Sequence, residues 1–205
     1  MYVLLKANGQ IDQFPYSITD LRNDNPDTSF GTSLDDASLA DFRVFPVEPT
    51  DQPETSKTER AVVADPEFVD GQWQQRWTIE PMGINEAKAV LWERAKFLRD
   101  QFIDAGVNLA GIGVFDSDAP SRGNINGAVT MALVAQISAQ PFSIDWKLAD
   151  NSVKKLNGAQ MIAAGIAVGK HVAECHEFAQ KIGIAILNAK NNSELKAINI
   201  EDGWP

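Results

Sequence analysis

Three side chains that can bind metal or transfer protons lie close together in the C-terminal half: His171, Cys175 and His176. His171 and Cys175 are four residues apart, so on a helix they would share one face, as zinc ligands on a helix can. His176 would point about 100° away from Cys175, and the chain has no other histidine or cysteine. A nucleophilic cysteine would also need an orienting third group and an anion hole. We therefore expect neither a metal site nor a catalytic pair, and interpret Cys175 as a buried thiol beside two partly exposed histidines.

Two other segments contain residue types found in calcium-binding or nucleotide-binding loops of other proteins. Asp116, Asp118 and Ser121 present side-chain oxygens, but the glycine and distal glutamate of an EF-hand loop do not follow them. Capping of the next helix by Asp118 or Ser121 explains these residues more simply. Gly111 and Gly113 lack the rest of a nucleotide-binding pattern, and no Gly-x-Ser-x-Gly elbow is present. The sequence therefore predicts no catalytic residues, no cofactor and no enzymatic activity.

A long helix is expected over Ile84–Ala105. Its apolar residues recur at spacings of three and four and form one stripe: Ile84, Ala87, Leu91, Ala95, Leu98, Phe102 and Ala105. The spacing is close to a heptad, which is compatible with a short coiled coil between subunits. Leu91, Leu98 and Phe102 are therefore candidate oligomer-interface residues. The alternative is that the stripe packs on a sheet of the same chain.

Helices and strands are expected to alternate after this helix. The expected elements are a strand over Val107–Phe115, a helix over Ile125–Ala139, a hairpin of Phe142–Leu148 with Val153–Leu156, a helix over Gly158–Lys190 capped by Asn157, and a strand over Leu195–Ile200. Small residues along the helix from Gly158 would let another helix approach closely. Ile162 and Ile166 on that helix complete the candidate oligomer interface.

Short strands and loops are expected before Gly83. Asn8-Gly9 and Asp70-Gly71 are typical of two-residue type I′ hairpin turns. Three prolines within residues 46–53 disfavour a helix or a central strand. One short helix is expected over Leu34–Phe42, with Ser33 as its N-cap.

Two tryptophans, Trp73 and Trp77, follow the second of these turns. They alternate with polar residues, so a strand would place both on one face. They could form the core of a small N-terminal module, which has few other large apolar residues. The other hypothesis is an aromatic patch that binds a partner protein.

Charge divides the chain near Gly83. Residues 1–83 carry 15 acidic and 6 basic residues, a net charge of −9, whereas residues 84–205 carry 13 and 12, a net charge of −1. This step predicts a domain boundary. Together with the expected elements, it predicts an α+β protein with an acidic, strand- and loop-rich docking module over residues 1–83 and an α+β domain over residues 84–205. The net charge of −10 argues against nucleic-acid binding. No apolar run is long enough to insert into a membrane, and the N-terminus does not resemble a signal peptide.

The C-terminal part resembles a domain of unknown function found in phage and prophage tail proteins. The resemblance covers roughly residues 86–205 and rests on several spaced segments: a helix ending near Gly106, Phe115–Val129, Phe142–Asn151, a long helix containing His171-Val172, Glu194–Ile200 and Gly203–Pro205. The front half is similar to N-terminal modules of tail-fibre and tail-fibre-assembly proteins. That similarity rests on the Asn-Gly turn, Phe14–Ile18, the Leu39-Ala40 to Pro46-Val47 stretch and Asp70–Trp73.

The resemblance implies a structural part of a virion tail, in a tail fibre or near the baseplate, made in the host cytoplasm. Expected partners are other copies of the chain, with a trimer as the first expected assembly, and other tail or fibre proteins; a host surface receptor is a further candidate. The alternative function is a tail-fibre assembly chaperone that binds the fibre tip. A glycan-binding protein that uses exposed tryptophans, and a small hydrolase, rank below these two.

Overall fold

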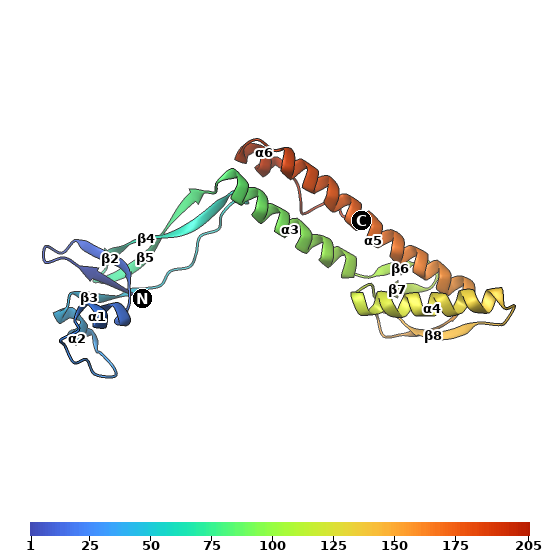
Figure 1. Cartoon of the computed structure of the whole chain (residues 1–205), viewed down its shortest axis with the longest axis horizontal. Helices are drawn as coiled ribbons and strands as arrows, with labels where there is room; N and C mark the ends of the chain where they lie inside the picture. The colour runs from blue at the N-terminus through green and yellow to red at the C-terminus, as the bar shows by residue number, and fades with distance from the viewer. The chain divides into compact units, whose positions relative to one another are not determined.

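The computed structural model describes all 205 residues, which form two compact units, Met1–Met82 and Gly83–Pro205 (Figure 1). The boundary lies one residue before the charge step that the sequence shows. Helices hold 44% of the residues and strands 25%, with most strands in the first unit, so the predicted α+β class is confirmed. We refer to the two parts as unit 1 and unit 2.

Unit 1 is a five-stranded sheet with two short helices. Its elements are β1 (Tyr2–Leu5), β2 (Ile11–Tyr16), α1 (Ile18–Asp24), α2 (Asp36–Asp41), β3 (Val44–Glu48), β4 (Glu59–Val69) and β5 (Gln72–Pro81). The strand order is β2-β1-β3-β5-β4, and only the pairing of β3 with β5 is parallel. A small core of Tyr16, Leu21, Leu39 and Val44 lies between the sheet and the helices.

A proline occurs in the central strand, contrary to the sequence prediction. Pro46 lies in β3, opposite Tyr2 of β1. The amide of Val47, one residue later, donates to Met1 O, so the Pro46 nitrogen faces away from β1. The other edge of β3 faces β5, which pairs only with Val47 and Glu48. No hydrogen bond of the sheet therefore needs the N–H that Pro46 lacks.

The two expected hairpins form, but only one has the expected turn. Asp70 and Gly71 both have positive φ, 50° and 85°, as a type I′ turn requires. At the first turn only Gly9 has a positive φ, 83°, and its amide donates to Lys6 O. This is a three-residue loop in which a type I turn precedes a left-handed glycine.

The two helices of unit 1 differ from the sequence prediction. Asp35, not Ser33, caps α2, because its carboxylate accepts a hydrogen bond from the Ser38 amide at 2.9 Å. Helix α1 was not predicted. A capping box between Ser17 and Asp20 begins it.

The segment between β3 and β4 lies along the second edge of β5. The Thr50 hydroxyl donates to Gln75 O at 2.9 Å, and the Trp77 indole donates to Thr50 O at 3.3 Å. These two bonds supply partners for β5 where β3 no longer pairs with it. On the other edge, the Met82 amide donates to Thr58 O and so extends the β4–β5 ladder.

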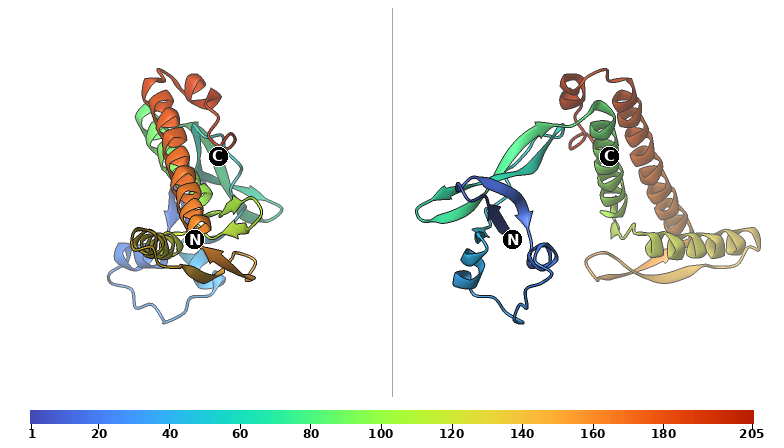
Figure 2. Two further views of the ribbon diagram at one scale, coloured as in Figure 1. Left: turned by 90° about the vertical axis from the view of Figure 1, so that its right-hand side faces the viewer. Right: turned by 60° about the vertical axis from the view of Figure 1, so that its left-hand side comes forward.

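Unit 2 is built on two long antiparallel helices. Its elements are α3 (Ile84–Asp104), β6 (Val107–Leu109), β7 (Gly113–Phe115), α4 (Ala119–Ile137), β8 (Ser143–Lys147), β9 (Val153–Asn157), α5 (Gly158–Asn188) and α6 (Asn192–Ala197). Helices α3 and α5 run side by side (Figure 2). Contacts between their opposite ends show the antiparallel direction: Lys88 Nζ donates to Leu187 O at 2.7 Å, and His171 Nε2 lies 2.8 Å from Phe102 O.

Helix α4 packs across the start of α5, and a second core lies there. Its buried residues include Phe115, Ile125, Leu148, Leu156 and Met161. Close packing depends on glycine, because a Cβ at residue 165 would lie 2.6 Å from Val129 Cγ2 of α4. The prediction that small residues on α5 admit a second helix is therefore confirmed, with a helix of the same chain.

The predicted helices over 84–105 and 158–190 are confirmed to within two residues, and Gly83 and Asn157 are their N-caps. The predicted strand over 107–115 is instead a tight hairpin, because Gly111 and Gly113 have positive φ, 80° and 140°. Helix α4 begins six residues before the predicted start, since Asp118 caps it.

The chain end contains a helix where a strand was predicted. The Asn191 side chain accepts from the Glu194 amide at 2.9 Å and so begins α6. The tail then returns to the long helices. The Trp204 ring stacks on Phe102 with centroids 5.4 Å apart, and meets Phe178 edge-on at 4.9 Å.

Candidate interaction surfaces

The histidine and cysteine pair serves the packing of α5 against α3. His171 Nε2 lies 2.8 Å from the carbonyl oxygen of Phe102, so this nitrogen carries the hydrogen and donates it. The acceptor is in the last turn of α3, where it also accepts a longer hydrogen bond, 3.3 Å, from the Ala105 amide. His171 therefore adds a second donor to a carbonyl at the end of the helix. The same nitrogen is 3.9 Å from Cys175 Sγ. Because it already holds a hydrogen, it cannot accept the thiol proton.

The Cys175 thiol is completely buried. Burial raises its pKa, and the Glu174 carboxylate raises it further. Both effects disfavour the thiolate, which is the reactive form. His176 is exposed. No group of three or more histidine, cysteine, aspartate or glutamate side chains in the structure is placed to hold a metal ion.

The acidic segment before α4 joins the end of α3 to the start of α4. Asp118 Oδ1 accepts the Ser121 amide at 2.8 Å, which confirms Asp118 as a helix cap. Hydrogen bonds from the side chain and the amide of Ser121 lower the pKa of the Asp118 carboxyl. The buried Ser117 hydroxyl donates to Ile103 O and accepts from Gly106 N at 2.9 Å. Arg122 pairs with Asp104 at 2.9 Å.

The candidate interface residues of α3 lie inside the chain. Leu91 and Leu98 are only 2% and 6% exposed, because α5 of the same chain covers their face of α3. Their assignment to an interface between subunits is therefore corrected: they leave no surface for a second copy. Phe102 is half-buried under Trp204.

The candidate residues on α5 lie on a different face, which we call the outer stripe. Ile162 is half-buried and Ile166 is 66% exposed; further along, Ile184 is 54% and Leu187 is 72% exposed. The outer stripe consists of Ile162, Ile166, Gly169, Ala173, His176, Gln180, Ile184 and Leu187, at spacings of three or four residues. Sequence reasoning found its first two isoleucines and missed the last two apolar residues.

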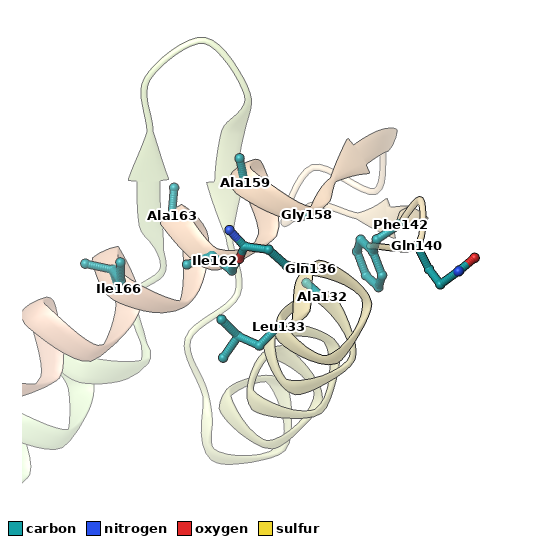
Figure 3. A pocket seen from close by; sticks show the side chains of 10 residues that line it. All are labelled: Ala132, Leu133, Gln136, Gln140, Phe142, Gly158, Ala159, Ile162, Ala163 and Ile166. Atoms are coloured by element: carbon teal, nitrogen blue, oxygen red, sulfur yellow. The ribbon is translucent and has the colours of Figure 1, made fainter. Parts of the chain in front are cut away.

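A groove of about 590 Å³ opens beside the first end of the outer stripe. Figure 3 shows Leu133 and Gln136 of α4 facing Ile162 and Ile166 of α5 across it. Ala159, Ala163 and Phe142 complete much of its lining. The groove is therefore mainly apolar and is formed where α4 crosses α5.

A second groove, of about 460 Å³, lies at the other end of the outer stripe. Ala89 and Trp92 of α3 form one side, and α5 contributes the other with Gly183, Ile184 and Leu187. A contact within the chain explains why residue 183 is glycine, because a Cβ there would lie 3.0 Å from Trp92 Cζ3. The outer stripe thus connects two apolar grooves.

Unit 1 has its own apolar face, on the β4–β5 ribbon. Phe68 is paired with Trp73 and Val63 with Trp77, so these four side chains share one face. We call this the aromatic face. Phe68 is 59% exposed and contacts Trp73, with ring centroids 5.4 Å apart; both tryptophans are half-buried. The hypothesis that the tryptophans form the core is wrong, because the buried core consists of other residues.

The opposite face of the ribbon is polar. Arg76 and Glu67 form an ion pair there, as do Arg60 and Glu80 at 3.7 Å. Phe68 was missed by sequence reasoning. A two-residue turn at Asp70-Gly71 would have placed it opposite Trp73.

In a comparison with protein families, residues 86–202 match a domain of unknown function, DUF4376. No curated protein and no solved structure matches the chain. No helix of the structure has the length and apolar character that crossing a membrane requires.

Replacing Leu91 by alanine tests the corrected role of the α3 stripe. We expect Leu91→Ala to lower the free energy of unfolding of unit 2 by about 2–5 kcal/mol, because it opens a cavity in the seam with α5. Val90→Ala is the matched control, since Val90 is 48% exposed on the same helix; its effect should stay within about 0.5 kcal/mol. Urea unfolding measures both, and equal effects would show that Leu91 is not a core residue.

The raised pKa of Cys175 predicts slow alkylation. A raised pKa keeps the Cys175 thiol neutral in the folded state. The contribution of the neutral thiol to the free energy of unfolding is complete below the thiol pKa of the unfolded chain. It falls as the pH rises through the thiol pKa of the folded chain. We expect iodoacetamide at pH 8 to react at least about 100-fold more slowly with the folded chain than in urea. Mass spectrometry measures both rates, and equal rates would contradict the burial of the thiol.

Proposed function

We propose that this chain, which belongs to the DUF4376 family, is a non-enzymatic structural component of a bacteriophage tail, in a tail fibre or at the baseplate. It acts by self-association and by docking to other tail proteins. The observation that supports this best is that each unit leaves an organised apolar face in water. Exposed apolar faces of this kind mark protein-interaction sites.

Self-association is assigned to unit 2. The outer stripe and its two grooves present large apolar side chains near both ends of α5, and three of these are more than half exposed. A helix that has apolar residues on two separate faces is suited to packing against two neighbours. Helix α3 is the first neighbour, and a second copy of the chain is the other.

Docking to other tail proteins is assigned to unit 1. The aromatic face provides the large, rigid side chains that dominate binding energy at protein interfaces. It lies on a unit with a net charge of −9. This charge favours a partner whose surface is basic around an apolar centre.

The assignment to a phage tail depends on the resemblance of residues 86–205 to tail-protein domains, since interaction surfaces alone do not name a partner. The resemblance and the exposed faces lead to the same class of protein. Both support the proposal that the chain becomes part of the virion after its synthesis in the host cytoplasm. A receptor on the host surface stays a further candidate partner of the aromatic face.

The second candidate function is a tail-fibre assembly chaperone that binds the fibre tip. The acidic unit 1 with its exposed aromatic face favours it, because a chaperone must cover apolar surface of an unfinished partner. The two functions differ in whether the chain remains in the finished particle.

Quantitative mass spectrometry of purified virions tests the proposed function. A structural component should be present at a fixed number of copies per particle, and that number would indicate the symmetry of its site. Absence from clean particles, together with expression in infected cells, would overturn the structural role in favour of the chaperone.

Replacing one aromatic residue tests the docking face. We expect Phe68→Ser to reduce incorporation of the chain into particles about tenfold, because exposed aromatic anchors often contribute more than 1 kcal/mol to binding. Phe97→Ser is the matched control, because Phe97 is 52% exposed on α3 of unit 2. A phage that lacks the gene and is complemented by each variant provides the measurement. Equal incorporation of the two variants would remove the aromatic face from the account.

A further inference from the structure

We propose that the outer stripe of α5 binds the outer stripe of a second copy in an antiparallel, two-fold symmetric dimer. The inference deepens the proposed function and rests on its self-association. It differs from the trimer that the resemblance implied, because the residues along the stripe match each other best in a two-fold arrangement.

The outer stripe has the form of a helix-pairing seam. Its eight residues recur at spacings of three and four over residues 162–187, as the seam of a helix pair requires. At about 1.5 Å per residue the stripe extends roughly 38 Å. Its apolar side chains lie at both ends: Ile162 and Ile166 at one, Ile184 and Leu187 at the other.

Gly169 lies near the middle of the outer stripe. Glycine is among the least favourable residues in the interior of a helix. Gly165 and Gly183 on the same helix are required because a Cβ would meet Val129 or Trp92. At Gly169 a Cβ would meet nothing within 4 Å, and the residue does not have a positive φ. No contact inside the chain explains this glycine, whereas a large side chain from outside the chain would.

The side chains of two outer stripes match in size when the helices are antiparallel. Such a pair, centred between residues 174 and 175, opposes positions whose numbers sum to about 349. Gly169 then faces Gln180 of the second copy, and Ala173 faces His176, so each small residue meets a large one. Ile162 faces Leu187, and Ile166 faces Ile184. A parallel pair would oppose Gly169 to Gly169 and Gln180 to Gln180, which leaves a gap at one layer and crowds another.

Charge favours the same direction. Lys170 and Glu177 lie on one flank of the stripe, where they form ion pairs along the helix with Glu174 at 3.5 Å and Lys181 at 2.8 Å. In an antiparallel pair the same flanks of the two helices meet. Lys170 of one copy then lies level with Glu177 of the other, and two such pairs form by symmetry. In a parallel pair, Lys170 and Glu177 of one copy would lie beside the opposite flank of the second copy. That flank carries Gly165, Val172 and Ala179 and no charge.

The two grooves fit the same arrangement. The groove between α4 and α5 ends at Ile162 and Ile166, and the groove between α3 and α5 contains Ile184 and Leu187. In the antiparallel pair, each groove of one copy faces the other kind of groove of the second copy. Ile184 and Leu187 of the second copy would therefore cover the groove that Leu133 and Ile162 line.

Two measurements on the full chain test the dimer. Light scattering should give twice the chain mass of 22.4 kDa. Ile166→Glu should weaken the dimer at least about 100-fold, because it places a charge in the seam. Val153→Glu is the matched control, since Val153 is 63% exposed on β9, away from the stripe; it should leave the dimer unchanged.

Single cysteines determine the direction of the pair. Ile166→Cys and Ile184→Cys chains that carry tags of different size should form a disulfide when mixed, and neither should cross-link efficiently to itself. Self-links at either position would overturn the antiparallel pair, and a mass of three chains would replace it with a trimer. A monomer at about 100 µM, far above the Kd of a stable dimer, would overturn self-association through α5. Virion mass spectrometry is independent of these outcomes, so failure of the dimer and failure of the tail assignment are distinguishable.

Discussion

The buried seam between α3 and α5 is the interaction on which unit 2 depends. It holds Leu91 and Leu98 on one helix and Cys175, Ala179 and Ile182 on the other, all nearly inaccessible to solvent. A polar contact secures each end, through Lys88 to Leu187 O and through His171 to Phe102 O. Because the seam uses one side of a 31-residue helix, the apolar residues on the other side of α5 stay in water. The internal packing that stabilises the unit thus also creates its outer stripe.

The sequence predicted the elements whose local signals are strong. Helices α3 and α5 have long periodic stripes and clear N-caps, and the type I′ turn at Asp70-Gly71 needs two residues that tolerate positive φ. The errors have two causes: strand pairing accepted a residue that usually breaks a sheet, and a local cap was overlooked. Pro46 is accepted in a central strand because no ladder bond requires its nitrogen, and residues 192–197 form a helix because Asn191 caps them.

The interaction surfaces were only partly predictable, for a related reason. A heptad-like stripe looks the same whether its partner is another helix of the chain or a second copy, so Leu91 and Leu98 were assigned to the wrong partner. The exposed end of α5 at Ile184 and Leu187 emerges only when it is known which face α3 covers. Likewise, Phe68 joins Trp73 only through strand register. In each case the sequence does not show which helix or strand packs against the residue.

The two units divide the proposed task between them: unit 2 assembles copies, and the acidic unit 1 presents aromatic side chains to a different protein. Cross-linking of intact phage particles with a carboxylate-reactive reagent tests this division most directly, since unit 1 offers 15 acidic side chains. The account predicts links from residues 1–82 to another tail protein and links between copies from residues 158–188. Particles that contain the chain but give only links within single chains would contradict it.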